Sequence, residues 1–217
     1  MPYKFCVSYS GGKDSALSLY RLIQAGNEPV AIITTVNSDL SRSWFHGIDT
    51  GVLSKVSDSL GIPLIKAVSE ADGRDYEAVF TEALTRAAEL GATHCAFGDI
   101  DIEGHLDWNR TVCAKAGLEA VLPLWQEDRA AVVREFIEAG FTAIVKAVSK
   151  SFNLPASMLG RVMDLELVRE ITDLGADPCG ENGEYHTFVY DGPLFRYPVE
   201  FETQGVFEND TSYSLII

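Results

Sequence analysis

The stretch Ser10-Gly11-Gly12-Lys13-Asp14-Ser15 follows a short apolar run, Tyr3 to Ser8, and precedes apolar residues at helical spacing. The order of strand, glycine turn and helix places it at a first βα junction. Adjacent glycines let main-chain N–H groups approach an anion at the positive end of the helix. The stretch therefore predicts a phosphate-binding loop, with serine hydroxyls as donors, Lys13 as counter-charge and Asp14 as a magnesium ligand. The alternative is a serine- and glycine-rich turn without a ligand.

Apolar runs alternate with helix-period segments over the first two thirds of the chain. Strands are expected at 3–8, 30–36, 63–68, 94–97 and 118–122, with helices after the glycine turn and at 48–60, 76–90, 106–116 and 128–139. This alternation predicts a Rossmann-like (HUP-type), doubly wound α/β fold with a parallel five-stranded sheet. The loop at Ser10, the segment around His46 and the acidic segment after Phe97 should then share the rim at the carboxyl ends of the strands.

The pattern changes beyond residue 140. A strand at 142–148, a helix at 164–174 and β-rich stretches at 185–190, 198–206 and 212–217 predict a smaller α+β subdomain. The sequence thus suggests a phosphate-binding domain at 1–140 and a smaller α+β subdomain at 141–217. The β-rich C-terminal region could support a homodimer.

Composition and charge restrict the class of protein. The 217 residues are 47% hydrophobic and 23% charged, without an apolar run near the ~20 residues of a membrane span, so a cytoplasmic protein is expected. The four cysteines are scattered, which suggests neither a disulfide framework nor a zinc site. The formal net charge of −15 argues against a nucleic-acid surface. Residues 176–217 are especially acidic, which fits a solvated face or a basic partner.

A second polar stretch, Gly180-Glu181-Asn182-Gly183-Glu184-Tyr185-His186-Thr187-Phe188, lies in the C-terminal part. Its density of carboxylate, amide and imidazole groups is more than fold stability requires. The interpretations are an acidic hairpin turn at Asn182-Gly183 or a binding site.

Both stretches resemble motifs of known enzymes. The first resembles the S-G-G-x-D-S signature of the PP-loop ATP pyrophosphatases, and its pairing with the second is similar to the diphthine–ammonia ligase branch of that superfamily. The likeness covers nearly the whole chain, although Glu184-Tyr185-His186-Thr187 stands where that branch tends to have E-F-E-T. The resemblance implies an ATP-dependent ligase that amidates a carboxylate with ammonia and releases AMP and pyrophosphate, with ATP and Mg²⁺ as cofactors. The acceptor would be diphthine on an elongation factor or another protein-borne or small-molecule carboxylate.

The chemistry explains why ATP is needed. Ammonia does not displace hydroxide from a carboxylate, whereas an acyl adenylate has AMP as its leaving group. The expected phosphate and magnesium contacts are Ser10, Gly11, Gly12, Lys13, Asp14 and Ser15, with His46 at the nucleotide. The expected catalytic groups are Lys13, Asp14, Glu181, Glu184 and His186. The expected substrate contacts are Gly98, Asp99, Asp101, Glu103, Arg110, Asn182 and Thr187.

Some of these assignments have a purely structural alternative. His46 could be a solvated loop residue, and the acidic turn at 99–103 could be solvated with Asp107 capping the next helix. Two other functions share the fold: sulfur transfer to an adenylated tRNA base, with Cys179 as a persulfide carrier, and a regulatory module that binds ATP without turnover. The acidic charge and the unpaired cysteines count against sulfur transfer.

Overall fold

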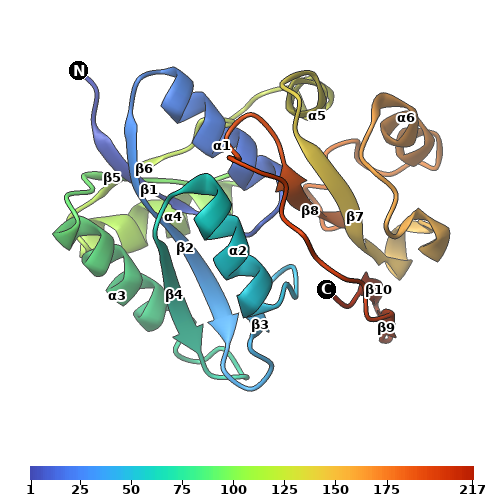
Figure 1. The fold of residues 1–217 in the computed structure, drawn as a ribbon, viewed down its shortest axis with the longest axis horizontal. Helices are drawn as coiled ribbons and strands as arrows, with labels where there is room; N and C mark the ends of the chain where they lie inside the picture. The colour runs from blue at the N-terminus through green and yellow to red at the C-terminus, as the bar shows by residue number, and fades with distance from the viewer.

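The computed structural model describes residues 1–217, which form two sheets with helices packed around them (Figure 1). In the first sheet five parallel strands lie in the order β4 (Leu64–Ser69), β2 (Glu28–Asn37), β1 (Lys4–Ser8), β5 (His94–Ala96) and β6 (Glu119–Val121). The two-residue strand β3 (Arg42–Ser43) pairs antiparallel with the end of β2. Counting parallel strands alone, the order is 3-2-1-4-5, the doubly wound arrangement that the sequence predicts.

Helices cover both faces of this sheet because successive strand residues point to opposite sides. Phe5 and Val7 face a larger core shared with α1 (Lys13–Gln24), α2 (Thr50–Leu60) and α5 (Arg129–Glu138). Cys6, between them, faces a smaller core shared with α3 (Tyr76–Glu89) and α4 (Glu103–Lys115). The apolar runs of the strands are therefore buried on both sides, as a parallel sheet requires.

The second sheet is antiparallel, in the order β8 (Tyr185–Asp191), β7 (Thr142–Ser149), β10 (Ser212–Leu215) and β9 (Val206–Glu208). Helix α6 (Leu165–Asp173) and the short 3₁₀ helices η1 (Lys150–Phe152) and η2 (Ala156–Met158) accompany it beside the parallel sheet (Figure 1). The predicted division at residue 140 falls between α5 and β7. One continuous core nevertheless crosses that position, since Leu17 of α1 and Phe188 of β8 belong to the same buried cluster.

Two expectations about secondary structure are wrong. The β-rich stretch 198–206 is a strand only from Val206. Before that residue its backbone makes single hydrogen bonds, such as that from Val199 N to the Tyr190 carbonyl oxygen at 2.7 Å, and the Phe201 ring packs on Phe188 at 5.1 Å between centroids. Helix α4 begins at Glu103, not near residue 106, so Asp107 lies inside the helix and caps nothing.

None of the helices combines the length and the apolar character that a membrane span demands. All four cysteines are free and buried.

Candidate active site

The glycine loop lies where β1 passes into α1, and its shape excludes larger residues. Gly11 has a φ of 85°, and a Cβ there would lie 2.5 Å from Ile48 Cδ1. A Cβ on Gly12 would lie 2.5 Å from His46 Cε1. Both positions therefore need glycine, and His46 closes over the loop. The predicted approach of the glycine N–H groups to an anion stays a prediction.

The N-terminus of α1 is left open to a ligand. No side chain caps the helix, and among its first three N–H groups only that of Lys13 has an acceptor, Thr187 Oγ1 at 3.0 Å. Ser10 Oγ accepts from Gly12 N at 3.2 Å and lies 3.3 Å from Ser15 Oγ. The Ser15 hydroxyl donates to the Gly12 carbonyl oxygen at 2.9 Å. Free N–H groups at the positive end of a helix make a site for an anion such as phosphate.

Lys13 is turned away from this open end. Its ammonium is buried, lies 2.8 Å from Asp14 Oδ2 and donates to the carbonyl oxygen of Cys179. Burial by itself lowers the pKa of Lys13, but the nearby Asp14 carboxylate, together with Cys179 and Tyr185, raises that pKa well above its usual value. Lys13 therefore stays charged and fixes Asp14 and the Cys179 backbone, while a direct phosphate contact stays a prediction.

A first cavity of about 380 Å³ opens in front of the loop. Three carboxylates line it, on Asp14, Asp99 and Glu181, and no Lys or Arg does. Aromatic rings form part of its wall: Tyr76 lies 6.1 Å from Phe45 and 5.9 Å from Trp108 between centroids. The full lining is Ser8, Ser10, Asp14, Ser15, Phe45, His46, Tyr76, Phe97, Gly98, Asp99, His105, Trp108, Asn109, Glu181 and His186.

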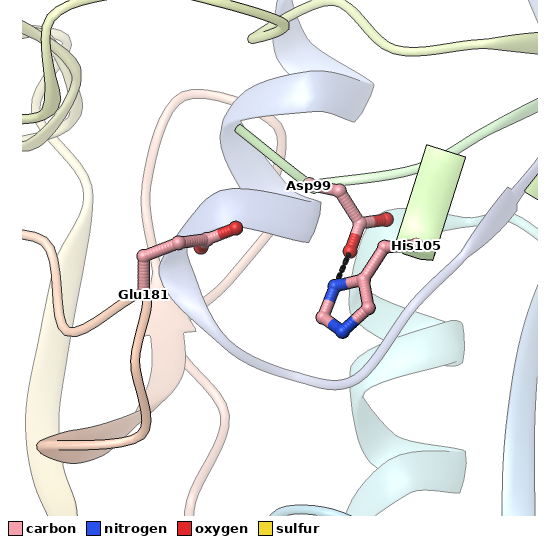
Figure 2. Close-up of side chains that lie close together, drawn as sticks. All are labelled: Asp99, His105 and Glu181. Atoms are coloured by element: carbon pink, nitrogen blue, oxygen red, sulfur yellow. Dashed lines mark hydrogen bonds and ion pairs between the residues drawn. The ribbon is translucent and has the colours of Figure 1, made fainter. Parts of the chain in front are cut away.

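Asp99, His105 and Glu181 form a cluster whose ligand atoms lie within 4.8 Å of one another. His105 Nδ1 and Asn109 Nδ2 each lie 2.8 Å from an Asp99 oxygen. Figure 2 shows the Asp99–His105 pair on one side of the site and the Glu181 carboxylate pointing toward it from the other. Hard carboxylate oxygens suit Mg²⁺, so the donors present in the cavity fit that ion.

The Glu181 carboxyl group has an altered acidity. Burial raises its pKa to about 7, and the negative charges of Asp14 and Asp99 act in the same direction. The N–H of Ile100 donates to Glu181 Oε1 at 3.1 Å and partly offsets this. A carboxylate that titrates near neutral pH can accept and release a proton during a reaction.

His46 and His186 form a second titratable pair, with ring centroids 4.7 Å apart. His46 Nδ1 lies 2.8 Å from the carbonyl oxygen of Thr187, which can only accept, so Nδ1 carries the proton. Burial lowers the pKa of His46 well below its usual value, and the neighbouring His186 adds to this. Burial likewise lowers the pKa of His186 to about 4. Both imidazoles are therefore neutral near pH 7.

Several residues that the sequence predicts for the site lie outside the first cavity. The Glu184 carboxylate accepts from Asn182 N and Nδ2, at 3.0 and 2.9 Å, and stabilises its own loop. Thr187 binds the Lys13 N–H through its hydroxyl. Asp101 forms an ion pair with Arg129. The predicted substrate contacts Glu103 and Arg110 are exposed. Direct catalytic or substrate contacts of these residues stay predictions.

Sequence reasoning did not single out Ser8, Phe45, Tyr76, Phe97 or His105, which all line the cavity. Ser8 ends β1 and Phe97 directly follows β5, so the rule that ligands meet the carboxyl ends of parallel strands could have found both. His105 lies in the first turn of α4, opposite Asp99, and the wrong start of that helix concealed it.

Comparisons with known proteins bear on both halves of the chain. Residues 3–120 match the diphthamide synthase N-terminal domain, and residues 128–216 match the diphthamide synthase C-terminal domain. The diphthine–ammonia ligase of Danio rerio is 26% identical, covering 94% of this chain and 89% of its own length. The human diphthine–ammonia ligase is also 26% identical, covering 91% and 82%.

A solved structure, described as a predicted subunit of tRNA methyltransferase from Methanocaldococcus jannaschii, is also similar. It covers 86% of this chain and 96% of its own, with a TM-score of 0.47 and 16% identity. Since the two domain matches together span nearly all residues, the chain belongs to the diphthamide synthase family.

Proposed function

We propose that the protein is an ATP-dependent ligase that adenylates the carboxylate of diphthine and transfers ammonia to it. The observation that carries this proposal is the first cavity itself. An open helix N-terminus, suited to phosphate, faces the same space as three carboxylates and an aromatic wall suited to a nucleotide base. The membership of the chain in a family whose relatives are named diphthine–ammonia ligase supports the same reaction.

The reaction has two steps. A carboxylate oxygen of the acceptor attacks the α-phosphorus of ATP, the bond between that phosphorus and the β-phosphate oxygen breaks, and pyrophosphate leaves. The nitrogen of ammonia then attacks the acyl carbon, AMP leaves with the bonding electrons, and the nitrogen loses a proton. The free N–H groups at the start of α1 would stabilise the charge that develops on the departing phosphates.

The carboxylates would divide between two roles. Asp14, oriented by Lys13, and Asp99, oriented by His105 and Asn109, would hold Mg²⁺. When bound, that ion supplies positive charge to the phosphate oxygens. Glu181, with its pKa near neutrality, would accept the proton that the nitrogen loses.

No observation favours sulfur transfer. Burial raises the pKa of the Cys179 thiol, and its Sγ donates to Asp14 Oδ1 at 3.4 Å, so it is not a ready nucleophile. The exposed strand β9, at the edge of the second sheet, offers a surface for the expected homodimer. We place the reaction in the cytoplasm.

The test is the product of ATP turnover with magnesium, ammonium and a diphthine-bearing elongation factor. AMP and pyrophosphate that depend on the acceptor and are lost in Asp14→Ala are expected. ADP and phosphate would exclude the pyrophosphatase reaction, and tight ATP binding without any turnover would favour the regulatory module.

A further inference from the structure

A second cavity, of about 670 Å³, adjoins the first and shares Phe45, His46 and His186 with it. Residues near β3, the end of β7 and the C-terminal strands form its walls. The lining residues that matter below are Leu40, Arg42, Trp44, Lys146, Phe207 and Ser214. The roles proposed above all belong to residues of the first cavity or of the glycine loop, and none belongs to this space.

The charges of the two cavities are opposite. The second has Lys146 and Arg42 in its lining and no Asp or Glu, whereas the first has three carboxylates and no Lys or Arg. The charge of the second cavity is thus also opposite in sign to the formal net charge of the chain, which is −15. Its electrostatic preference is for an anion.

Lys146 is the group that requires explanation. It is 1% exposed, its ammonium donates to Ser214 Oγ at 2.6 Å, and no carboxylate lies within ion-pair distance. Burial lowers its pKa to about 8, and Arg42 adds to the effect. A buried ammonium without a counter-ion is unfavourable for the fold, and an apolar side chain would pack there at less cost. Arg42 is engaged with the carbonyl oxygens of Gly47 and Ile217, at 3.0 and 2.9 Å.

We infer that the second cavity binds the acceptor, with Lys146 as the partner of its carboxylate. This inference rests on the proposed function and names the site of its second substrate. The apolar wall of Leu40, Trp44 and Phe207 would contact the group that carries the carboxylate, and a cavity of this size accommodates a side chain presented by a protein.

The position of Lys146 also suits transfer to the nucleotide. A Cβ on Gly47 would lie 3.7 Å from Lys146 Nζ, so the ammonium lies beside the segment 45–47, of which Phe45 and His46 line both cavities. His46 and His186 line both cavities and are neutral near pH 7. A carboxylate held by Lys146 would therefore lie on the side of the second cavity that adjoins the nucleotide site.

The test compares Lys146→Met and Lys146→Arg with Lys66→Met, which removes an exposed lysine from β4. With a diphthine-bearing elongation factor as substrate, Lys146→Met should raise the acceptor KM by about 10- to 100-fold, the usual effect of losing a charge-assisted hydrogen bond. The Kd for ATP should change less than about twofold, Lys146→Arg should recover part of the acceptor affinity, and Lys66→Met should match the wild type. Removing the unpaired charge should leave Tm unchanged or raised.

Three results would overturn the inference. An unchanged acceptor KM in Lys146→Met would show that the ammonium does not bind the acceptor. A weaker affinity for ATP alone would assign the cavity to the nucleotide phosphates. A lower Tm together with weaker binding of both substrates would make Lys146 a structural residue.

A failure of the proposed function can be told apart from a failure of this inference. If the wild-type protein forms no AMP with the acceptor, the proposed reaction fails, and calorimetric titration with butanoate still tests the cavity. Binding of butanoate to the wild type and Lys66→Met, with loss in Lys146→Met, supports a carboxylate site. Equal binding by all three proteins, or binding by none, overturns it.

Discussion

Gly98 is where a single methyl group should disturb the site most directly. A Cβ at this position would lie 2.8 Å from the Asp14 carbonyl carbon and 2.8 Å from Ser15 N, both backbone atoms of the first turn of α1. Ordinary contact begins near 3.4 Å, so the loop after β5 must move from the helix by about 0.6 Å in Gly98→Ala. Overpacking of this kind costs about 1–3 kcal/mol of folding free energy.

The displacement falls between the Asp99 carboxylate and the phosphate-binding end of the helix. Misplacing groups by a large part of an ångström lowers turnover by roughly 10- to 100-fold. Urea denaturation and acceptor-dependent AMP release measure the two effects. Gly104→Ala is the matched control, because a Cβ there meets nothing within 4 Å and lies in a helical turn, where alanine stabilises by up to about 1 kcal/mol. If Gly98→Ala behaves like Gly104→Ala, the argued close packing of loop and helix is wrong.

Three further predictions concern single side chains. Glu181→Gln should lower amide formation by roughly 100-fold while ATP–pyrophosphate exchange continues, since only the proton acceptor is lost; equal loss of both would contradict its role. His186 has a lowered folded pKa, so unfolded chains bind its proton first and stability falls as pH drops from 6.5 toward about 4. In urea titrations His186→Gln should flatten this slope by up to about 1.4 kcal/mol per pH unit, and an unchanged slope would refute it. Arg129→Met should cost about 1–2 kcal/mol in urea, because Arg129 bridges Asp101 and the buried Asp177, each at 2.6 Å; wild-type stability would show the bridge to be inert.

Local pattern was enough to predict the parallel sheet and the rim that holds the site. Each strand and helix has its own hydrophobic periodicity, and the glycine loop predicts a phosphate site at the N-terminus of α1. The strand prediction failed in a segment whose side chains pack but whose backbone does not pair with another strand. The alternating residues of 198–206 suggest a strand. In the structure the Phe201 ring packs on the Phe188 ring, and the backbone is paired as a strand only from Val206.

The directions of side chains in the second polar stretch could not be read from spacing. Gly180 and Gly183 have φ values of 71° and 84°, which interrupt any regular alternation. Glu181 consequently points into the first cavity, while Glu184, three residues later, binds Asn182. Lys13 is fixed by a carbonyl 166 residues away in sequence, which no local pattern reveals. Lys146 lies in an apolar strand, and its neighbours in the second cavity come from distant segments.

The glycine loop is also the seam between the two sheets. Val189 N of β8 donates to the Gly11 carbonyl oxygen at 2.8 Å, and Thr187 Oγ1 accepts from Lys13 N. A chain cut at residue 140 would leave the Gly11 carbonyl and the Lys13 N–H without these partners. The N-terminal fragment should therefore bind nucleotide only after the C-terminal fragment has been added. For the same reason, a chimera that exchanges C-terminal sheets between relatives would have to preserve the loop contacts of β8 to keep its ATP site.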